Sequence, residues 1–378
     1  MTEQPDMVDG IVPPASKRAL LQRLDLPLYT LLFPLLSAVA VAVSLYDMAL
    51  VGTLAAAAIL MGAVLAAVHH AEVVAHRVGE PFGTLVLAIA VTVIEVSLIV
   101  SLMLSDAGDA SALARDTVFA AIMIILNGIV GLCLMAGGLR HGEQRFTLHG
   151  VSAALAVLTA LVVLSLVLPN YVTSAAGPTY SPAQLVFVAI VSLFLYLIFV
   201  LVQTVRHREY FLPDADMPAD AHAGRPSGAT TATALVFLLI ALVGVVLLAK
   251  GLSATVERAV LGAGLPLAIV GVVIAALVLA PEGLAAYRAT KRNRLQTSLN
   301  LALGSALATI GLTIPSVAIV SLVLDLPLAL GIGAKSITLL ILTLFTITLS
   351  LGTGRTTILG GAVHLVIFAA YLFTTVVP

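Results

Sequence analysis

Two glutamates lie inside long apolar stretches of the sequence, where a charged side chain is costly. Glu95 stands near the middle of the run 82–104, whose only other polar residues are two threonines and two serines. Glu282 lies between Pro281 and Gly283 in a second apolar run. An ionisable group at such a depth in a membrane costs about 3 kcal/mol or more and marks ion pathways and proton relays. These two carboxylates are therefore the first candidates for chemistry.

The surroundings of each glutamate suit a cation. Thr92 precedes Glu95 by about one helical turn and shares its helix face. Pro281 removes a backbone donor and Gly283 loosens the helix, so carbonyl oxygens beside Glu282 become free. Calcium takes about six to eight oxygen ligands of this kind. Two plainer interpretations stay open: Glu95 as a protonated carboxyl that packs between helices, and Glu282 as an acidic residue at a helix end.

The elements that carry these residues are predicted to be membrane helices. The chain has 378 residues, 61% of them hydrophobic and 10% charged, whereas about a quarter of the residues in soluble domains are charged. Its continuous apolar runs reach the ~18 residues that cross a bilayer core and lack the alternation of a membrane β-strand. The runs begin near Leu26, Met48, Phe82, Val118, Val151, Leu185, Ala232, Val260, Leu299, Leu326 and Thr356. We therefore expect an all-α membrane protein with about 11 transmembrane helices.

Two polar segments divide the chain. Residues 1–25 form a polar tail, and residues 206–229 form a linker rich in aspartate and proline. The first transmembrane helix is expected at 26–47, a first five-helix unit at 48–205 and a second at 230–378. Because five is odd, the second unit must enter the membrane from the opposite side, as in an inverted repeat with its ion site between the halves. Two halves of similar size without a repeat are the alternative.

Basic residues in the connecting segments predict the orientation. Fourteen of the 18 Lys and Arg residues fall on one side when the helices are counted off, and the positive-inside rule assigns that side to the cytoplasm. The exceptions are Arg115, Lys250 and Arg258 on the other side and Lys335 inside a span. We expect a bacterial inner (plasma) membrane, with the N-terminus in the cytoplasm and the C-terminus in the periplasm or outside the cell.

The inverted repeat predicts that the two glutamates meet. Glu95 and Glu282 each fall in the second helix of a five-helix unit, and the repeat axis sets those helices against each other. Two carboxylates in a site of low dielectric constant cannot both stay charged and empty, so they share a divalent cation or take protons. Either occupant neutralises the site, which favours exchange of a cation for protons. Because protons compete for these ligands, cation binding is expected to strengthen as the pH rises.

Other polar residues are weaker candidates. Asn127 in the third helix of the first unit, and Ser305 and Thr309 in the matching helix of the second, are either further oxygen ligands or hydrogen bonds between helices. A group at the predicted cytoplasmic end of one span is either a vestibule or proton path or a solvated helix end. That group is His70, Glu72, His76 and Glu80.

The residues around the two glutamates resemble the calcium/cation exchanger superfamily, and most closely its branch of bacterial ChaA-type calcium/proton (sodium-potassium/proton) antiporters. The resemblance rests on Gly79-Glu80-Pro81-Phe82-Gly83, Val93-Ile94-Glu95-Val96-Ser97, Ala280-Pro281-Glu282-Gly283-Leu284, Gly304-Ser305-Ala306-Leu307-Ala308-Thr309 and Thr353-Gly354-Arg355-Thr356. It covers nearly all of the chain after the tail. It implies the one-plus-five-plus-five fold, alternating access, and Glu95 and Glu282 as the paired transport carboxylates.

One departure from the family pattern bears on the substrate. The wider family has Gly-Asn-x-x-Glu before each acid, whereas this chain has Val91-Thr92-Val93-Ile94-Glu95 and Leu279-Ala280-Pro281-Glu282. The missing asparagines remove ligands and flexibility from the site. Sodium and potassium therefore stand beside calcium as expected substrates.

The sequence predicts a secondary active antiporter that exports Ca²⁺ in exchange for H⁺ by alternating access. The alternative is a Na⁺/H⁺ and K⁺/H⁺ antiporter with little selectivity for Ca²⁺. A passive cation channel gains nothing from two glutamates set by inverted halves, and an enzyme is disfavoured because no nucleophile–base pair or metal triad has usable spacing. We expect no cofactor besides the transported ions. The expected partners are membrane lipid, small cations and protons, with no nucleic acid, since no basic or aromatic-basic patch is present; the oligomeric state stays open.

Overall fold

The computed structural model describes residues 26–45, 50–79, 82–104, 110–212 and 226–377. The predicted tail 1–25 and most of the predicted linker lie outside the described residues.

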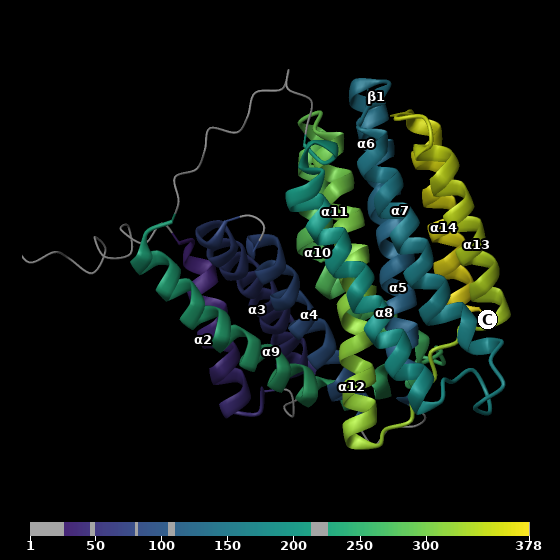
Figure 1. Cartoon of the computed structure of the whole chain (residues 1–378). Coiled ribbons are helices and arrows are strands. Elements are labelled where there is room, and N and C mark those ends of the chain that lie inside the picture. The colour runs from purple at the N-terminus through teal and green to yellow at the C-terminus, as the bar shows by residue number, and fades with distance from the viewer. Residues whose placement is uncertain (1–25, 46–49, 80–81, 105–109, 213–225, 378) are drawn as a thin grey trace, which may run out of the picture.

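The described chain is almost entirely helical, as predicted (Figure 1). Nine helices are long and apolar enough to cross a membrane, and two further apolar helices bring the number of described segments to eleven. The α-helices are α2 (Leu28–Ala42), α3 (Leu50–Val78), α4 (Phe82–Met103), α5 (Leu113–Met123), α6 (Val130–His141), α7 (Leu148–Val162), α8 (Pro182–Leu201), α9 (Gly228–Gly262), α10 (Ala268–Lys291), α11 (Leu295–Ala308), α12 (Ile314–Leu324), α13 (Ala334–Leu351) and α14 (Ile358–Val376). The prediction of an all-α membrane protein is confirmed.

Short segments of different helical pitch connect several of these helices. The π-helices are η3 (Ile124–Ile129) between α5 and α6, η4 (Val163–Val167) after α7, η6 (Val202–Arg206) after α8 and η8 (Thr309–Thr313) between α11 and α12. The 3₁₀ turns are η2 (Ala110–Ala112), η5 (Leu168–Asn170) and η7 (Arg208–Tyr210). Two short strands, β1 (Gln144–Arg145) and β2 (Arg355–Thr356), pair antiparallel. A π-helix therefore interrupts the third helix of each predicted unit.

Two predicted boundaries were wrong. The eighth span was expected from Val260, but α9 continues to Gly262 and α10 begins only at Ala268, because Gly264 takes a left-handed φ of 69° in the turn between them. The tenth span was expected from Leu326, but the chain runs without helix from there to Gly333. Lys335 is consequently an exposed residue of the first turn of α13, at the end of this span and not deep inside it.

The connecting segments gather at two ends of the molecule. At the first, His141 Nε2 lies 3.3 Å from the Lys291 carbonyl, and the Phe146 amide donates to the Gly354 carbonyl at 3.0 Å. We call this the basic end and define it by residues 141–147, 206–211, 291–296 and 353–357. We define the distal end by residues 111–115, 170–181 and 325–333, which are joined by bonds such as Gly331 N–H to Pro178 O at 2.9 Å. Four of the described segments that charge counting assigned to one side thus share one end.

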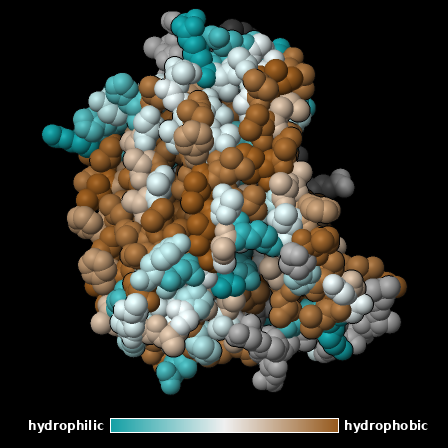
Figure 2. Space-filling model, turned by 90° about the vertical axis from the view of Figure 1, so that its right-hand side faces the viewer, coloured by the Kyte–Doolittle hydropathy of each residue, from teal (hydrophilic) through white to brown (hydrophobic). Residues whose placement is uncertain are grey.

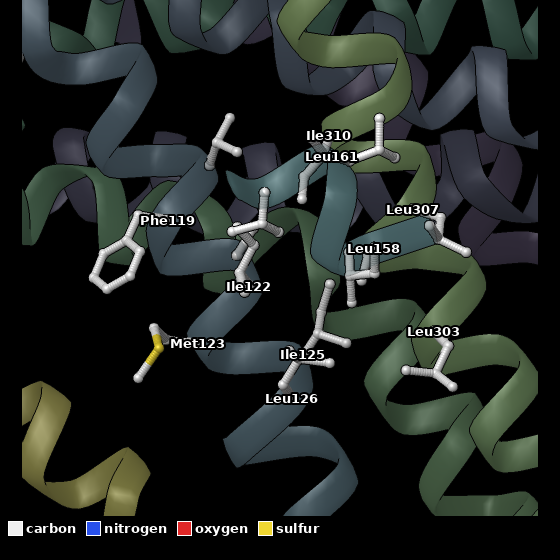
Figure 3. Close-up of a cluster of buried hydrophobic side chains, with 14 of the residues drawn as sticks. Phe119, Ile122, Met123, Ile125, Leu126, Leu158, Leu161, Leu303, Leu307 and Ile310 are labelled. Atoms are coloured by element: carbon white, nitrogen blue, oxygen red, sulfur yellow. The ribbon is translucent and has the colours of Figure 1, made fainter. Parts of the chain in front are cut away.

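Two hydrophobic cores underlie this arrangement. The larger is built from α5 to α8 and α11 to α14 with their π-helices, and Figure 3 shows part of it around Ile122 and Ile310. The smaller joins α2, α3, α4 and α9, which lie together on the left of Figure 1. Helices α4 and α10 contribute to both cores: Leu98 and Val278 belong to the smaller, Ile99 and Leu279 to the larger. The helices that carry the two candidate glutamates therefore lie between the two cores.

The outer surface matches a membrane environment. Figure 2 shows one broad face, on which hydrophobic residues cover the middle and hydrophilic residues gather toward the top and the lower part. Large apolar side chains on α13 and α14 are exposed, among them Phe345 (64%), Val366 (68%) and Phe373 (66%). A soluble protein rarely exposes such a continuous apolar surface, whereas lipid tails cover it in a bilayer.

Candidate cation site

Glu95 is enclosed by protein and holds one defined hydrogen bond. Its side chain is 3% exposed, and the Thr313 hydroxyl donates to Glu95 Oε2 at 2.9 Å. Thr313 is the last residue of η8, where the wider turn of the π-helix shifts the side chains relative to α11. Insertions of this kind occur often at functional sites. A hydroxyl aimed at a buried carboxylate stabilises its charged form.

Glu282 holds its position in an unbroken helix. Helix α10 continues through Pro281, and the missing proline N–H leaves the Leu277 carbonyl without its usual helical donor. Gly283 does not break the helix. It allows α10 to pack closely against η3, because a Cβ at this position would lie 3.1 Å from Ile129 Cδ1 of η3. Glu282 Oε2 is buried and has no hydrogen-bond partner among the described residues. A buried carboxylate oxygen without a partner needs a proton, a water or a cation.

Both glutamates line one cavity of about 240 Å³. Of the predicted supporting ligands, Thr92, Ser305 and Thr309 line it as well. No cluster of three or more His, Cys, Asp or Glu side chains occurs in the described part of the chain, so hydroxyl, carbonyl or water oxygens must complete the coordination of a bound cation. Two carboxylates with neutral oxygens form a ligand set for a hard cation.

The cavity extends from the glutamates toward the basic end. Gln203 and Asn300 line it, and Asn300 Nδ2 donates to the Phe211 carbonyl, which belongs to the basic end. Gly304 on α11 faces open space, since a Cβ there would meet no heavy atom within 4 Å. Tyr196 on α8 forms part of the opposite wall. The path is thus lined by amides, hydroxyls and apolar groups.

Asn127 does not line this cavity. It is fully buried in η3 and lies against the last two helices: its Nδ2 donates to Thr343 Oγ1 at 2.9 Å, and its Oδ1 accepts from His364 Nδ1 at 2.9 Å. His364, for which the sequence analysis predicts no role, is also fully buried, and its Nε2 has no partner among the described residues. Asn127 therefore joins the two units to each other rather than presenting its amide to Glu282.

The predicted histidine–glutamate group separates into different surroundings. His70 is fully buried and its Nε2 lies 2.8 Å from the Thr30 carbonyl of α2, an acceptor left free because Pro34 lacks the N–H that would bond to it. Glu72 is exposed and its Oε2 lies 3.9 Å from His69 Nδ1. His76 is exposed in the last turn of α3. Glu80 lies outside the described residues. His70 thus attaches α2 to α3, and only Glu72 and His76 face the outside of the protein.

Sequence reasoning missed the other groups that complete the site. Thr313, Tyr196, Gln203 and Asn300 were not singled out. Thr313 had a usable signal, since it follows Thr309 by four residues and shares its face in a helix. Gln203 and Asn300 lie nearer the basic end, where polar residues are common and carry no signal of their own, and Tyr196 lies within an apolar stretch of α8.

Comparison with known proteins gives a consistent result. The family model described as sodium/calcium exchanger protein matches residues 48–205 and 233–377. The putative ionic transporter y4hA of Sinorhizobium fredii is 50% identical over 358 residues, which cover 93% of this chain and 97% of the relative. The sodium-potassium/proton antiporter ChaA of Escherichia coli is 36% identical over 338 residues, which cover 88% of this chain and 89% of the relative.

Solved structures share the fold at low sequence identity. Native YfkE superposes with a TM-score of 0.71 at 15% identity, covering 93% of this chain and 99% of that one. The H⁺/Ca²⁺ exchanger CAX superposes with a TM-score of 0.71 at 15% identity, covering 94% of this chain and 89% of that one. The prediction of a transport protein, and not an enzyme, is confirmed by the family match. With two glutamates on a shared cavity between two helical cores, the chain belongs to the family of sodium/calcium exchanger proteins.

Proposed function

We propose that this membrane protein is a secondary active cation/proton antiporter, with Glu95 and Glu282 as its transport carboxylates. The observation that carries the proposal is that α4 and α10 bring both carboxylates to one cavity, one with a hydroxyl donor and one with an unpartnered oxygen. Such a pair cannot stay doubly charged and empty in a site of low dielectric constant. Binding of a cation therefore displaces protons, and binding of protons displaces the cation.

Alternating access follows from an inverted five-plus-five repeat. Element pairing supports the repeat: α4 contacts η8 while α10 contacts η3, and α8 contacts α12 while α14 contacts α6. In each pair, a helix of one unit contacts the third helix of the other unit, and the second contact is the same with the two units interchanged. The interface between α4 and α11 is open at Gly304 of α11. The corresponding interface between α10 and α5 is closed at Gly271 of α10, where a Cβ would lie 3.0 Å from the Thr117 nitrogen. This asymmetry is what an antiporter open to one side requires.

The open side is proposed to be the cytoplasm. The cavity extends toward the basic end, and basic connecting segments remain in the cytoplasm of a bacterial inner membrane. Antiport would then use inward proton flow to export the cation, and the empty pair of carboxylates would recruit its cation from the cytoplasm.

Calcium is the first candidate substrate because two carboxylates match the charge of a divalent cation. Sodium and potassium are the second, and a specific observation favours them: the Escherichia coli relative, similar over most of this chain, is a sodium-potassium/proton antiporter. The cavity also contains few neutral oxygens near the glutamates, chiefly those of Thr92, Ser305 and Thr309. Calcium takes about six to eight oxygen ligands, so with monodentate carboxylates this set would need water to complete the coordination.

A proton-flux experiment tests the function and identifies the substrate. Purified protein is reconstituted in proteoliposomes with an imposed pH gradient, and calcium, sodium and potassium are added in turn while a pH-sensitive dye reports the gradient. Antiport predicts that at least one cation collapses the gradient in a saturable manner. Cation-evoked current without proton movement would identify a channel instead. No response to any of the three cations in folded protein would refute cation/proton antiport of this substrate class.

A further inference from the structure

A second cavity lies at the distal end, and unlike the first it is lined by a basic side chain. Its volume is about 140 Å³, and its polar lining comes from α5, α13 and α14. The polar residues are Asp116, Lys335, Ser336, Tyr371, Thr374 and Thr375. In the first cavity the only charged residues are the two glutamates themselves.

The two cavities are built from corresponding elements of the two five-helix units. The first is lined by the second and fifth helices of the first unit and the third helix of the second unit, which are α4, α8 and α11. The distal cavity is lined by the start of α10 with α14 and α5, in which the units have exchanged roles, and additionally by the start of α13. Tyr196 and Tyr371 occupy matching places on α8 and α14, the fifteenth and fourteenth residue of each helix. The distal cavity is therefore the counterpart of the cation cavity.

The distal cavity is closed toward the cation site. Phe119 lines it and also belongs to the larger core, where Figure 3 shows it on the same helix as Ile122 and Met123. The ring of Phe119 meets that of Tyr371 edge to face, with centroids 5.6 Å apart. Close packing of α10 on α5 at Gly271 seals the same interface. An apolar layer thus separates the distal cavity from the carboxylates.

Lys335 supplies the uncompensated charge of this cavity. Asp116 Oδ1 already accepts a hydrogen bond from Arg115 Nε at 2.8 Å, and a second nitrogen of Arg115 donates to the Gly331 carbonyl. The Lys335 ammonium donates to the Thr374 carbonyl and forms no ion pair with any described carboxylate. A carbonyl satisfies a donor but does not cancel a charge. Among the charged side chains that line this cavity, Lys335 is therefore the one whose charge no ion pair compensates.

We propose that the distal cavity is the external mouth of the cation pathway and that Lys335 acts there as a fixed positive charge, which weakens cation binding from outside and favours release. This inference rests on the proposed function. A positive charge at a mouth lowers the local concentration of cations and their rate of association. The lining of the cation cavity toward the basic end carries neutral side chains such as Asn300, so the two sides of the membrane would differ in apparent affinity.

Transport measured from each side tests the inference. Exchange is assayed in inside-out and right-side-out vesicles with the cation identified above, for wild type, Lys335→Gln and Lys335→Arg. Lys335→Gln should lower the external half-saturating cation concentration by about fivefold, the effect of two unit charges about 4 Å apart in bulk water. The cytoplasmic value should stay at the wild-type level, Lys335→Arg should restore the external value, and high salt should reduce the difference.

The matched control is Lys250→Gln. Lys250 is exposed about three turns before the distal end of α9 and does not line the distal cavity, so both values should match wild type. An unchanged external value in Lys335→Gln, or equal shifts on both sides, would overturn the inference while leaving antiport intact. Absence of exchange in wild type would instead overturn the proposed function, and the inference with it.

Discussion

Replacing Thr313 by valine removes one hydroxyl from the cation site and keeps the shape of the side chain. Thr313 is fully buried, and its hydroxyl donates to Glu95 Oε2 at 2.9 Å. A hydrogen bond to a charged acceptor contributes about 1.5–3 kcal/mol, and about 1.4 kcal/mol corresponds to a factor of ten in an equilibrium constant. The substitution should therefore disfavour the charged carboxylate by a factor of about 10 to 100.

The charged form of Glu95 is the form that binds a cation in the proposed mechanism. At a fixed neutral pH, the apparent cation affinity of Thr313→Val should fall by about tenfold or more. Since one pH unit corresponds to about 1.36 kcal/mol, the pH of half-maximal cation binding should move by about one to two units in the alkaline direction. A higher pH should restore much of the lost affinity, because fewer protons then compete for the site.

The assay is cation-evoked proton release from inside-out vesicles, titrated with cation at several pH values. Thr159→Val is the matched control, because the Thr159 hydroxyl donates to the Leu155 carbonyl of its own helix at 2.7 Å and does not line the cavity. Its curves should coincide with those of wild type. Coincidence of the Thr313→Val curves with wild type across the whole pH range would refute the role given to this hydrogen bond.

Two further predictions concern stability and are checked by thermal unfolding in detergent. Gly311→Ala should lower the unfolding midpoint, because its Cβ would lie 2.6 Å from Tyr196 Cβ and overpacking costs about 1–3 kcal/mol. The Cβ of Gly304→Ala would meet open space, so this variant should leave the midpoint unchanged. Asn127→Ala should destabilise by about 1–3 kcal/mol, since His364 Nδ1 loses its partner, without weakening cation affinity in the vesicle assay. Equal midpoints for the glycine variants, or weaker cation affinity in Asn127→Ala, would contradict these expectations.

The two glutamates could be identified from the sequence because a charged residue within an apolar run is visible in the order of the residues alone. It also gave the all-α membrane class and the number of helical segments, since hydropathy reports length and continuity. It placed Thr92, Ser305 and Thr309 among the candidates, and the structure brings all three to the cavity of Glu95 and Glu282.

The direction of a polar side chain could not be obtained in the same way. Asn127 and Thr309 were equally good candidates for cation ligands in the sequence. In the structure, η3 directs Asn127 to His364, whereas η8 brings Thr309 to the cavity and the hydroxyl of Thr313 to Glu95. A π-helix adds a residue to one turn and changes which side chains share a face, and neither hydropathy nor composition records it. The turn between α9 and α10 was missed for a related reason: Gly264 ends the helix through its backbone conformation, within residues that are all apolar or small.

Exchange by the two glutamine variants tests the central claim most directly. Glu95→Gln and Glu282→Gln are compared with wild type and with Glu143→Gln, whose carboxylate pairs with Arg355 at the exposed basic end, 3.3 Å from a guanidinium nitrogen. Monodisperse protein with a wild-type unfolding profile establishes that each variant is folded. The account predicts that both site variants lose cation-evoked proton flux while Glu143→Gln retains it. Full exchange in either folded site variant would contradict a site made of two transport carboxylates.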